Sequence, residues 1–164
     1  MALQELLGPS IAAVAALAGV VAGAGIGSRS QERHWIRDAV REGCAEVLRT
    51  YAVIHEQLGY WARRGDRPTI DWGEWNRAMG QVRLLATPEV VSAGDAIDTE
   101  FWLIDHELKA GRGGLENWLT FQQRLEAKHL DFVNAARKNL QRRSVSLARS
   151  VGRPPNDHPM WRTR

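Results

Sequence analysis

Glu126 and His129 form the pair of residues in this sequence that comes closest to metal chemistry. A Glu-x-x-His spacing places two ligands one turn apart on a helix, and such pairs bind iron or manganese in four-helix carboxylate proteins. Those centres also need a second copy of the motif and two further carboxylates. The sequence has no second copy. We therefore expect no metal or other cofactor, with His129 at the edge of the core and Glu126 in solvent.

Two further polar clusters, His55-Glu56 and Asp105-His106-Glu107, contain groups capable of acid–base chemistry. Residues adjacent in sequence point to different faces of a helix, so neither cluster forms a ready site. His55 falls near an apolar stripe, which favours a core or boundary histidine over a catalytic one.

The single cysteine, Cys44, lies on an apolar stripe without a basic neighbour on its face. This pattern predicts a small buried hydrophobic residue rather than a reactive thiolate. The sequence also lacks a phosphate-binding P-loop and a His-Glu-x-x-His zinc motif. It therefore predicts no catalytic residue, and we expect a protein that is not an enzyme.

Charge is absent from one long stretch, Leu6 to Ser28, which is rich in Ala, Gly and Val. A segment of this size without charge is what a membrane-spanning helix requires. We predict a membrane anchor over residues 1–28. Because the stretch is only moderately hydrophobic, a buried Ala/Gly helix remains an alternative. A leader cleaved near Ala22-Gly23-Ala24 is a second alternative.

The basic residues beside this stretch give the predicted anchor a direction. Arg29, Arg33, Arg37 and Arg41 follow it, and no Lys or Arg precedes it. Positive residues are retained on the cytoplasmic side, so we expect a single-pass plasma-membrane protein with its N-terminus outside and its C-terminal domain in the cytoplasm. Trp35 lies among these arginines, where an aromatic ring suits the membrane interface. We assign Arg29, Arg33, Trp35 and Arg37 to that interface.

Within the predicted anchor, Gly19, Gly23 and Gly27 recur at intervals of four residues. Small residues at this spacing let two helices approach closely in lipid. They predict a contact face for a homo-oligomer, although a stretch rich in Ala and Gly also produces such spacings by chance.

The remaining chain has the apolar period of helices in four segments: residues 31–64, 69–86, 88 to about 110, and 115–149. Asp71 and Thr87 are expected as N-caps, with Pro88 in the first helical position. Residues 29–150 then form one domain. The predicted fold class is all-α: a transmembrane helix followed by an antiparallel bundle of about four helices.

Residues 137–164 carry eight basic residues and one acidic residue, Asp157. Pro and Gly interrupt the last part, and we predict a disordered basic tail over 151–164. Such a tail suits contact with anionic lipid or simple solvation. A net charge of only +3, with no interleaved aromatic residues apart from Trp161, makes a nucleic-acid partner unlikely.

Seven tryptophans are many for 164 residues. Trp61, Trp102 and Trp118 lie on or beside the apolar stripes, where core packing is the default. Trp72 and Trp102 are the two whose exposure would mark a partner site, because an exposed aromatic patch signals an interaction surface.

Three short stretches follow one another behind the uncharged run: Arg33–Asp38 (RHWIRD), Thr87–Val91 (TPEVV) and Phe132–Leu140 (FVNAARKNL). In this order the chain resembles small uncharacterised single-pass membrane proteins of actinobacteria with a helical cytoplasmic domain. The resemblance covers most of residues 10–142. It implies an anchored helical protein and assigns no catalytic residues.

Together these patterns predict a membrane-anchored helical protein that acts as an interaction or scaffold module. Its expected partners are the lipid bilayer, a second copy of the chain and another protein. The alternative is a membrane-associated enzyme or effector with a polar site inside the helical bundle, which would need several titratable side chains facing one cavity.

Overall fold

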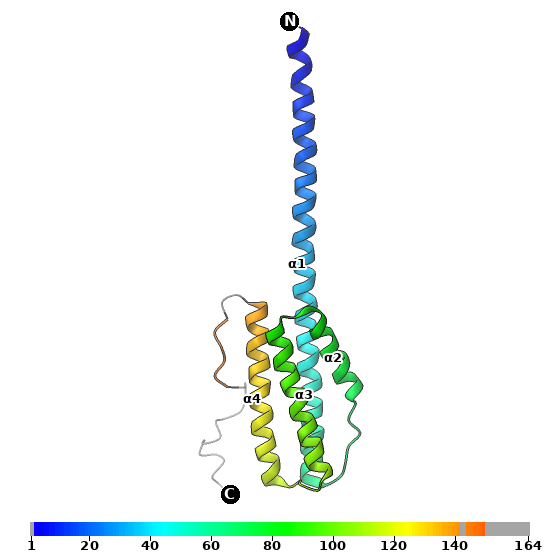
Figure 1. The fold of residues 1–164 in the computed structure, drawn as a ribbon, viewed down its shortest axis with the longest axis vertical. Coiled ribbons are helices and arrows are strands. Elements are labelled where there is room, and N and C mark those ends of the chain that lie inside the picture. The colour runs from blue at the N-terminus through cyan, green and yellow to red at the C-terminus, as the bar shows by residue number, and fades with distance from the viewer. Residues whose placement is uncertain (1, 142–143, 150–164) are drawn as a thin grey trace. The chain divides into compact units, whose positions relative to one another are not determined.

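The computed structural model describes residues 2–141 and 144–149, with side chains for residues 31–141 and 144–149. Over these residues the chain forms four helices and no strand: α1 (Ala2–Arg64), α2 (Trp72–Leu85), α3 (Pro88–Lys109) and α4 (Leu115–Leu140) (Figure 1). The all-α prediction is confirmed. Contacts divide the chain into two compact units, Met1–Ala39 and Val40–Arg164.

The first unit belongs to α1 and contains the predicted anchor. Its backbone is helical from residue 2 without a break, so the predicted membrane helix and the predicted helix over 31–64 are one helix, α1. The surroundings of Gly19, Gly23, Gly27 and Arg29, and with them the predicted contact face and part of the predicted interface, lie outside what the structure describes. Across the portion of the chain described, no helix has both the length and the hydropathy needed to cross a bilayer. Arg33, Trp35 and Arg37 are exposed to solvent, and Trp35 is 64% exposed.

The second unit is a bundle in which successive helices alternate in direction: the later part of α1, then α2, α3 and α4 (Figure 1). The predicted apolar stripes form its core. Buried residues from the four helices include Val47, Ile54, Leu58, Trp75, Met79, Val82, Ile97, Phe101, Ile104, Leu125 and Phe132. Their spacing of three and four along each helix is what brings them to one side.

Both predicted N-caps are confirmed, and they fix the start of α2 and α3. Asp71 Oδ1 accepts hydrogen bonds from the N–H groups of Gly73 at 2.9 Å and Glu74 at 3.1 Å. Thr87 has the extended backbone of an N-cap, and Pro88 occupies the first turn. The cap at Asp71 also corrects the predicted helix over 69–86, because α2 begins only at Trp72.

The last helix is shorter than predicted, since α4 ends at Leu140 instead of near Arg149. Residue Gln141 turns extended, and residues 144–149 run alongside α4. The Asn134 side chain provides the reason. Its Oδ1 accepts from Leu147 N–H at 2.7 Å, and its Nδ2 donates to the Leu147 carbonyl at 3.0 Å. An amide that pairs with backbone offers an alternative to the helical bonds of that segment.

Gly59 on α1 is a point of close helix approach. A methyl group there would lie 2.7 Å from Cζ2 of Trp118, a buried and rigid indole of α4. We expect Gly59→Ala to lower the free energy of unfolding by about 1–2 kcal/mol, because overpacking exceeds the gain in helix propensity. Gly80→Ala in α2 is the control, since no atom lies within 4 Å of its new methyl group. Urea denaturation of both variants should show opposite shifts; a stabilised Gly59→Ala would contradict the close contact.

Candidate functional site

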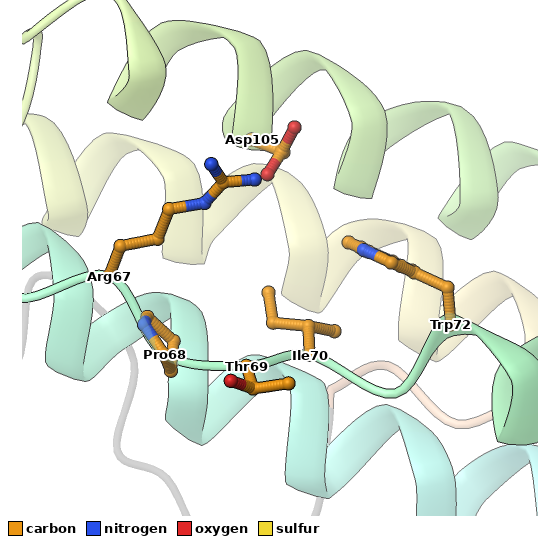
Figure 2. Close-up of a pocket in the computed structure, with 6 residues that line it drawn as sticks. All are labelled: Arg67, Pro68, Thr69, Ile70, Trp72 and Asp105. Atoms are coloured by element: carbon orange, nitrogen blue, oxygen red, sulfur yellow. The ribbon is translucent and has the colours of Figure 1, made fainter.

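A surface pocket of about 350 Å³ lies where the loop after α1 crosses α3. Its lining comes from the loop, from the first residue of α2 and from one residue of α3: Arg67, Pro68, Thr69, Ile70, Trp72 and Asp105 (Figure 2). The volume falls within the range of small-molecule and side-chain binding sites. Three apolar side chains and two oppositely charged ones meet here.

The pocket exists because α2 is short. With 14 residues α2 spans about 21 Å, whereas the 22 residues of α3 span about 33 Å. The extended loop before α2 therefore passes beside the rest of α3 on this side (Figure 2). A loop is thinner than a helix and leaves a hollow over Asp105. Gln57 Nε2 holds the loop to α1 through the Thr69 carbonyl at 3.4 Å.

Trp72 and Trp102 form a stacked aromatic pair at the edge of this pocket. Their ring centroids are 5.3 Å apart and their planes differ by 13°. Trp72 is half-buried, and Trp102, on α3, is 52% exposed. Core packing, the default expected for Trp102, is therefore wrong for that residue, and the exposure that would mark a partner site is found at Trp102 and in part at Trp72. A large exposed aromatic surface beside a pocket is typical of an interaction site.

Asp105 is the deepest polar group of the pocket. Its side chain is 5% exposed, and its Oδ2 lies 2.5 Å from Nζ of Lys109, one turn further along α3. The Lys109 side chain is 44% exposed. Arg67 reaches from the loop toward the Asp105 side of the pocket (Figure 2), with its guanidinium 5.5 Å from the centroid of the Trp61 ring.

A second pocket, of about 400 Å³, lies at the end of the bundle where the loops 65–71 and 110–114 begin. It is lined largely by glycines and by Arg63 and Arg64, which are exposed. The Gly114 N–H closes this end by donating to the Ala62 carbonyl at 2.7 Å. Because none of its lining side chains is a buried polar group, we take the pocket at Asp105 as the candidate site.

His129, the histidine of the Glu-x-x-His pair, lies at the edge of the core. Its ring stacks on Tyr51 of α1 with centroids 4.5 Å apart. Burial lowers the pKa of His129 below its ordinary value of 6.5, and the charge of Glu126 opposes part of that shift. Among the side chains described, no group of three or more His, Cys, Asp or Glu residues is placed to hold a metal ion.

The lowered pKa of His129 has a consequence for stability. Between that lowered pKa and 6.5 the unfolded chain binds more protons than the folded one, so stability falls as the pH decreases through this window. We expect His129→Phe, which keeps an aromatic ring on Tyr51, to lose less stability than the parent chain between pH 7.5 and pH 5. Thermal melts at several pH values measure this. Parallel curves for the two proteins would contradict it.

Cys44 and His55 have the surroundings that the sequence predicts. Cys44 is buried, and burial raises the pKa of its thiol to about 11, which keeps it protonated at neutral pH. His55 is half-buried and packs against Trp118 and Tyr51 at centroid distances of 5.2 and 5.7 Å. Both residues contribute to packing.

Sequence reasoning identified the two tryptophans but missed Arg67, Ile70 and Asp105 as their neighbours. The segment from Arg63 to Pro68 indicated only a loop, and Asp105 belonged to a polar cluster, although the structure buries it. A weak signal existed, since Asp105 falls four residues after Phe101 on the core side of α3. Comparison with protein families, curated proteins and solved structures finds no match to this chain.

Proposed function

We propose that this chain is a membrane-anchored interaction module whose helical bundle binds a protein partner through the Trp72–Trp102 pair. Here the pair and the adjoining pocket are together called the aromatic face. The bundle supplies a rigid support, and the predicted anchor over residues 1–28 confines it to a membrane. Catalysis is not part of this proposal.

The exposure of the stacked tryptophan pair is the observation that carries the proposal. An indole left half in water forgoes a hydrophobic gain of roughly 25 cal/mol for each Å² of apolar surface. Trp102 follows the buried Phe101 on α3, and about half of its own surface lies in solvent. Aromatic residues are enriched in the centres of protein interfaces and provide much of their binding energy.

The anchor is supported by sequence, with an uncharged run followed by basic residues and by Trp35. Exposure of Arg33, Trp35 and Arg37 agrees with a place at the lipid interface. The glycines at 19, 23 and 27 support association of two copies within the bilayer. These observations support the membrane anchor, and none of them depends on the aromatic face.

The alternative, an enzyme or effector with a polar site inside the bundle, has less support. Within the described side chains the buried carboxylates are Glu100 and Asp105. Each has its own basic partner, Arg124 for Glu100 and Lys109 for Asp105. They therefore do not form a pair with one shared proton, the arrangement that acid–base catalysis commonly uses.

Site-specific photo-crosslinking in cells tests the aromatic face. A photoreactive phenylalanine analogue placed at position 102 should crosslink to a discrete protein. The same analogue at Gln123, an exposed position on α4, is the matched control. Trp72→Ala should reduce the crosslink at 102, because the aromatic face then lacks the ring of Trp72. Equal labelling from 102 and 123, or none from 102, would refute the proposal.

Membrane fractionation tests the anchor separately. The full chain should sediment with membranes and resist extraction by carbonate, and Val14→Arg combined with Val20→Arg should release it, because a charge at the centre of a span costs about 2.5–3.5 kcal/mol. Protease added to intact cells should leave the C-terminal tail uncut. Recovery of the unaltered chain in the soluble fraction would refute the anchor. The aromatic face is tested separately, by the crosslinking experiment.

A further inference from the structure

The proposed function leaves open what chemistry the aromatic face recognises, and we infer that the pocket beside Trp72 accepts the cationic side chain of a partner protein, an arginine or a lysine. Asp105 is its charged contact, and Trp72 and Ile70 are its walls. This inference rests on the proposed function, because it names the ligand of the same face.

Asp105 is the group that gives the pocket its preference. Its carboxylate is 95% removed from solvent, fixed to a rigid helix, and paired on Oδ2 with Lys109. It remains part of the pocket lining. A carboxylate can accept several hydrogen bonds at once, and a charge with restricted access to water gains more from a new counter-ion than an exposed one does.

The walls suit the rest of such a ligand. A lysine or arginine side chain has a long aliphatic stem, and Ile70, Pro68 and the Trp72 ring provide apolar surface for it. A cation over an indole face is further stabilised by the ring's electron density. The stacked Trp72–Trp102 pair extends that aromatic surface outward to meet the partner's backbone.

Arg67 is a cation of the chain itself that lines the same pocket and reaches toward Asp105 (Figure 2). Its guanidinium also lies 5.5 Å from the centroid of the Trp61 ring, which is outside the pocket lining. Unlike Asp105 it is exposed and belongs to a loop. Arg67 is therefore the internal cation that an incoming one must displace from the neighbourhood of Asp105. Removal of Arg67 and removal of Asp105 should therefore change the affinity of the pocket for a cation in opposite directions.

The test uses the purified full chain in a mild detergent and small probes of known charge. Binding of N-acetyl-arginine methylamide is followed through the ¹⁵N-labelled indole resonances of Trp72 and Trp102, and the matched neutral probe is N-acetyl-citrulline methylamide. We expect the arginine probe, and not the citrulline probe, to shift these resonances. Arg67→Ala should tighten its binding by about fivefold, and Asp105→Asn should abolish it.

Several results would overturn the inference. Binding that weakens in Arg67→Ala and strengthens in Asp105→Asn would show a pocket for anions, and N-acetyl-aspartate is included to detect it. Equal binding of arginine and citrulline probes would show that charge is irrelevant. Choline bound in place of the arginine probe would point to a lipid headgroup. Because Asp105→Asn alters a buried residue, its folding is checked by thermal melting. Arg67→Ala alters an exposed residue, and whether it tightens or weakens binding of the arginine probe tests the inference independently.

The two proposals fail in different ways. If the photoreactive group at position 102 captures a partner but the arginine probe does not bind, the aromatic face is an interaction surface and the cation pocket is wrong. If the arginine probe binds but position 102 captures nothing, the pocket chemistry holds and the interaction module is wrong.

Discussion

Phe101→Ala is expected to lower the free energy of unfolding by about 3–5 kcal/mol, as removal of a fully buried phenylalanine does in other proteins. Phe101 has no exposed surface and lies between three aromatic rings of α1 and α2. Its centroid is 5.1 Å from Trp75, 5.7 Å from Tyr51 and 6.2 Å from Trp72. Loss of the ring leaves a cavity that none of these three large side chains can fill without moving.

Denaturation by urea, followed by circular dichroism, measures this effect. Leu103→Ala, two residues away on α3 and 48% exposed, is the control and should change stability by less than about 0.5 kcal/mol. Because Trp72 touches Phe101, the variant should also weaken crosslinking from position 102, even at temperatures where it stays folded. Similar losses for Phe101→Ala and Leu103→Ala would show that the aromatic cluster does not form as described.

Arg124→Ala is expected to cost about 2 kcal/mol. Arg124 Nη2 on α4 lies 2.5 Å from Oε1 of Glu100, whose side chain is only 8% exposed. That oxygen has no aligned hydrogen bond, so the attraction is chiefly between the charges. Removal of one partner from a fully buried pair costs about 3–5 kcal/mol. The value here is smaller because Arg124 is 42% exposed and water screens it.

A second ion pair supplies a matched control. Arg83 and Asp95 approach as closely, at 2.6 Å, but both side chains are about half exposed. Arg83→Ala should therefore cost less than about 1 kcal/mol. Glu100→Gln in the Arg124→Ala background should recover stability, because the buried charge is then gone. Urea denaturation measures the free energy of unfolding of both arginine variants. Equal decreases would show that burial of Glu100 does not make its ion pair more stabilising than the exposed one.

The core of the bundle and the loop that lines the pocket differ in how firmly they are held. The core of the bundle, centred on Phe101, holds α3 rigidly and with it Asp105 and Trp102. The loop that carries Arg67 and Ile70 has no such core and is fixed mainly by Asp71 at one end and Gln57 in the middle. Binding sites often combine a rigid element with a loop in this way, because the loop can adjust to a partner without unfolding the scaffold.

The sequence by itself determined the helices and most of the core. Apolar residues repeat at three and four positions, and every residue of the α3 stripe from Val90 to Leu108 is buried as that period requires. The caps at Asp71 and Thr87 could also be predicted, because their side chains or backbones act on the next few residues only. The helix predicted to reach Arg149 was wrong, because a side chain on α4, Asn134, binds the backbone of Leu147.

Only the tertiary structure decided where a site could be. Helix periodicity states which face of α3 is buried, but not that α2 is too short to cover it. The pocket depends on that mismatch in length, and on a loop residue, Arg67, reaching a helix residue, Asp105, far along the chain. The stacking of Trp72 on Trp102 likewise joins residues 30 positions apart (102 − 72). Local patterns carry no information about such long-range contacts, because these arise when whole helices pack.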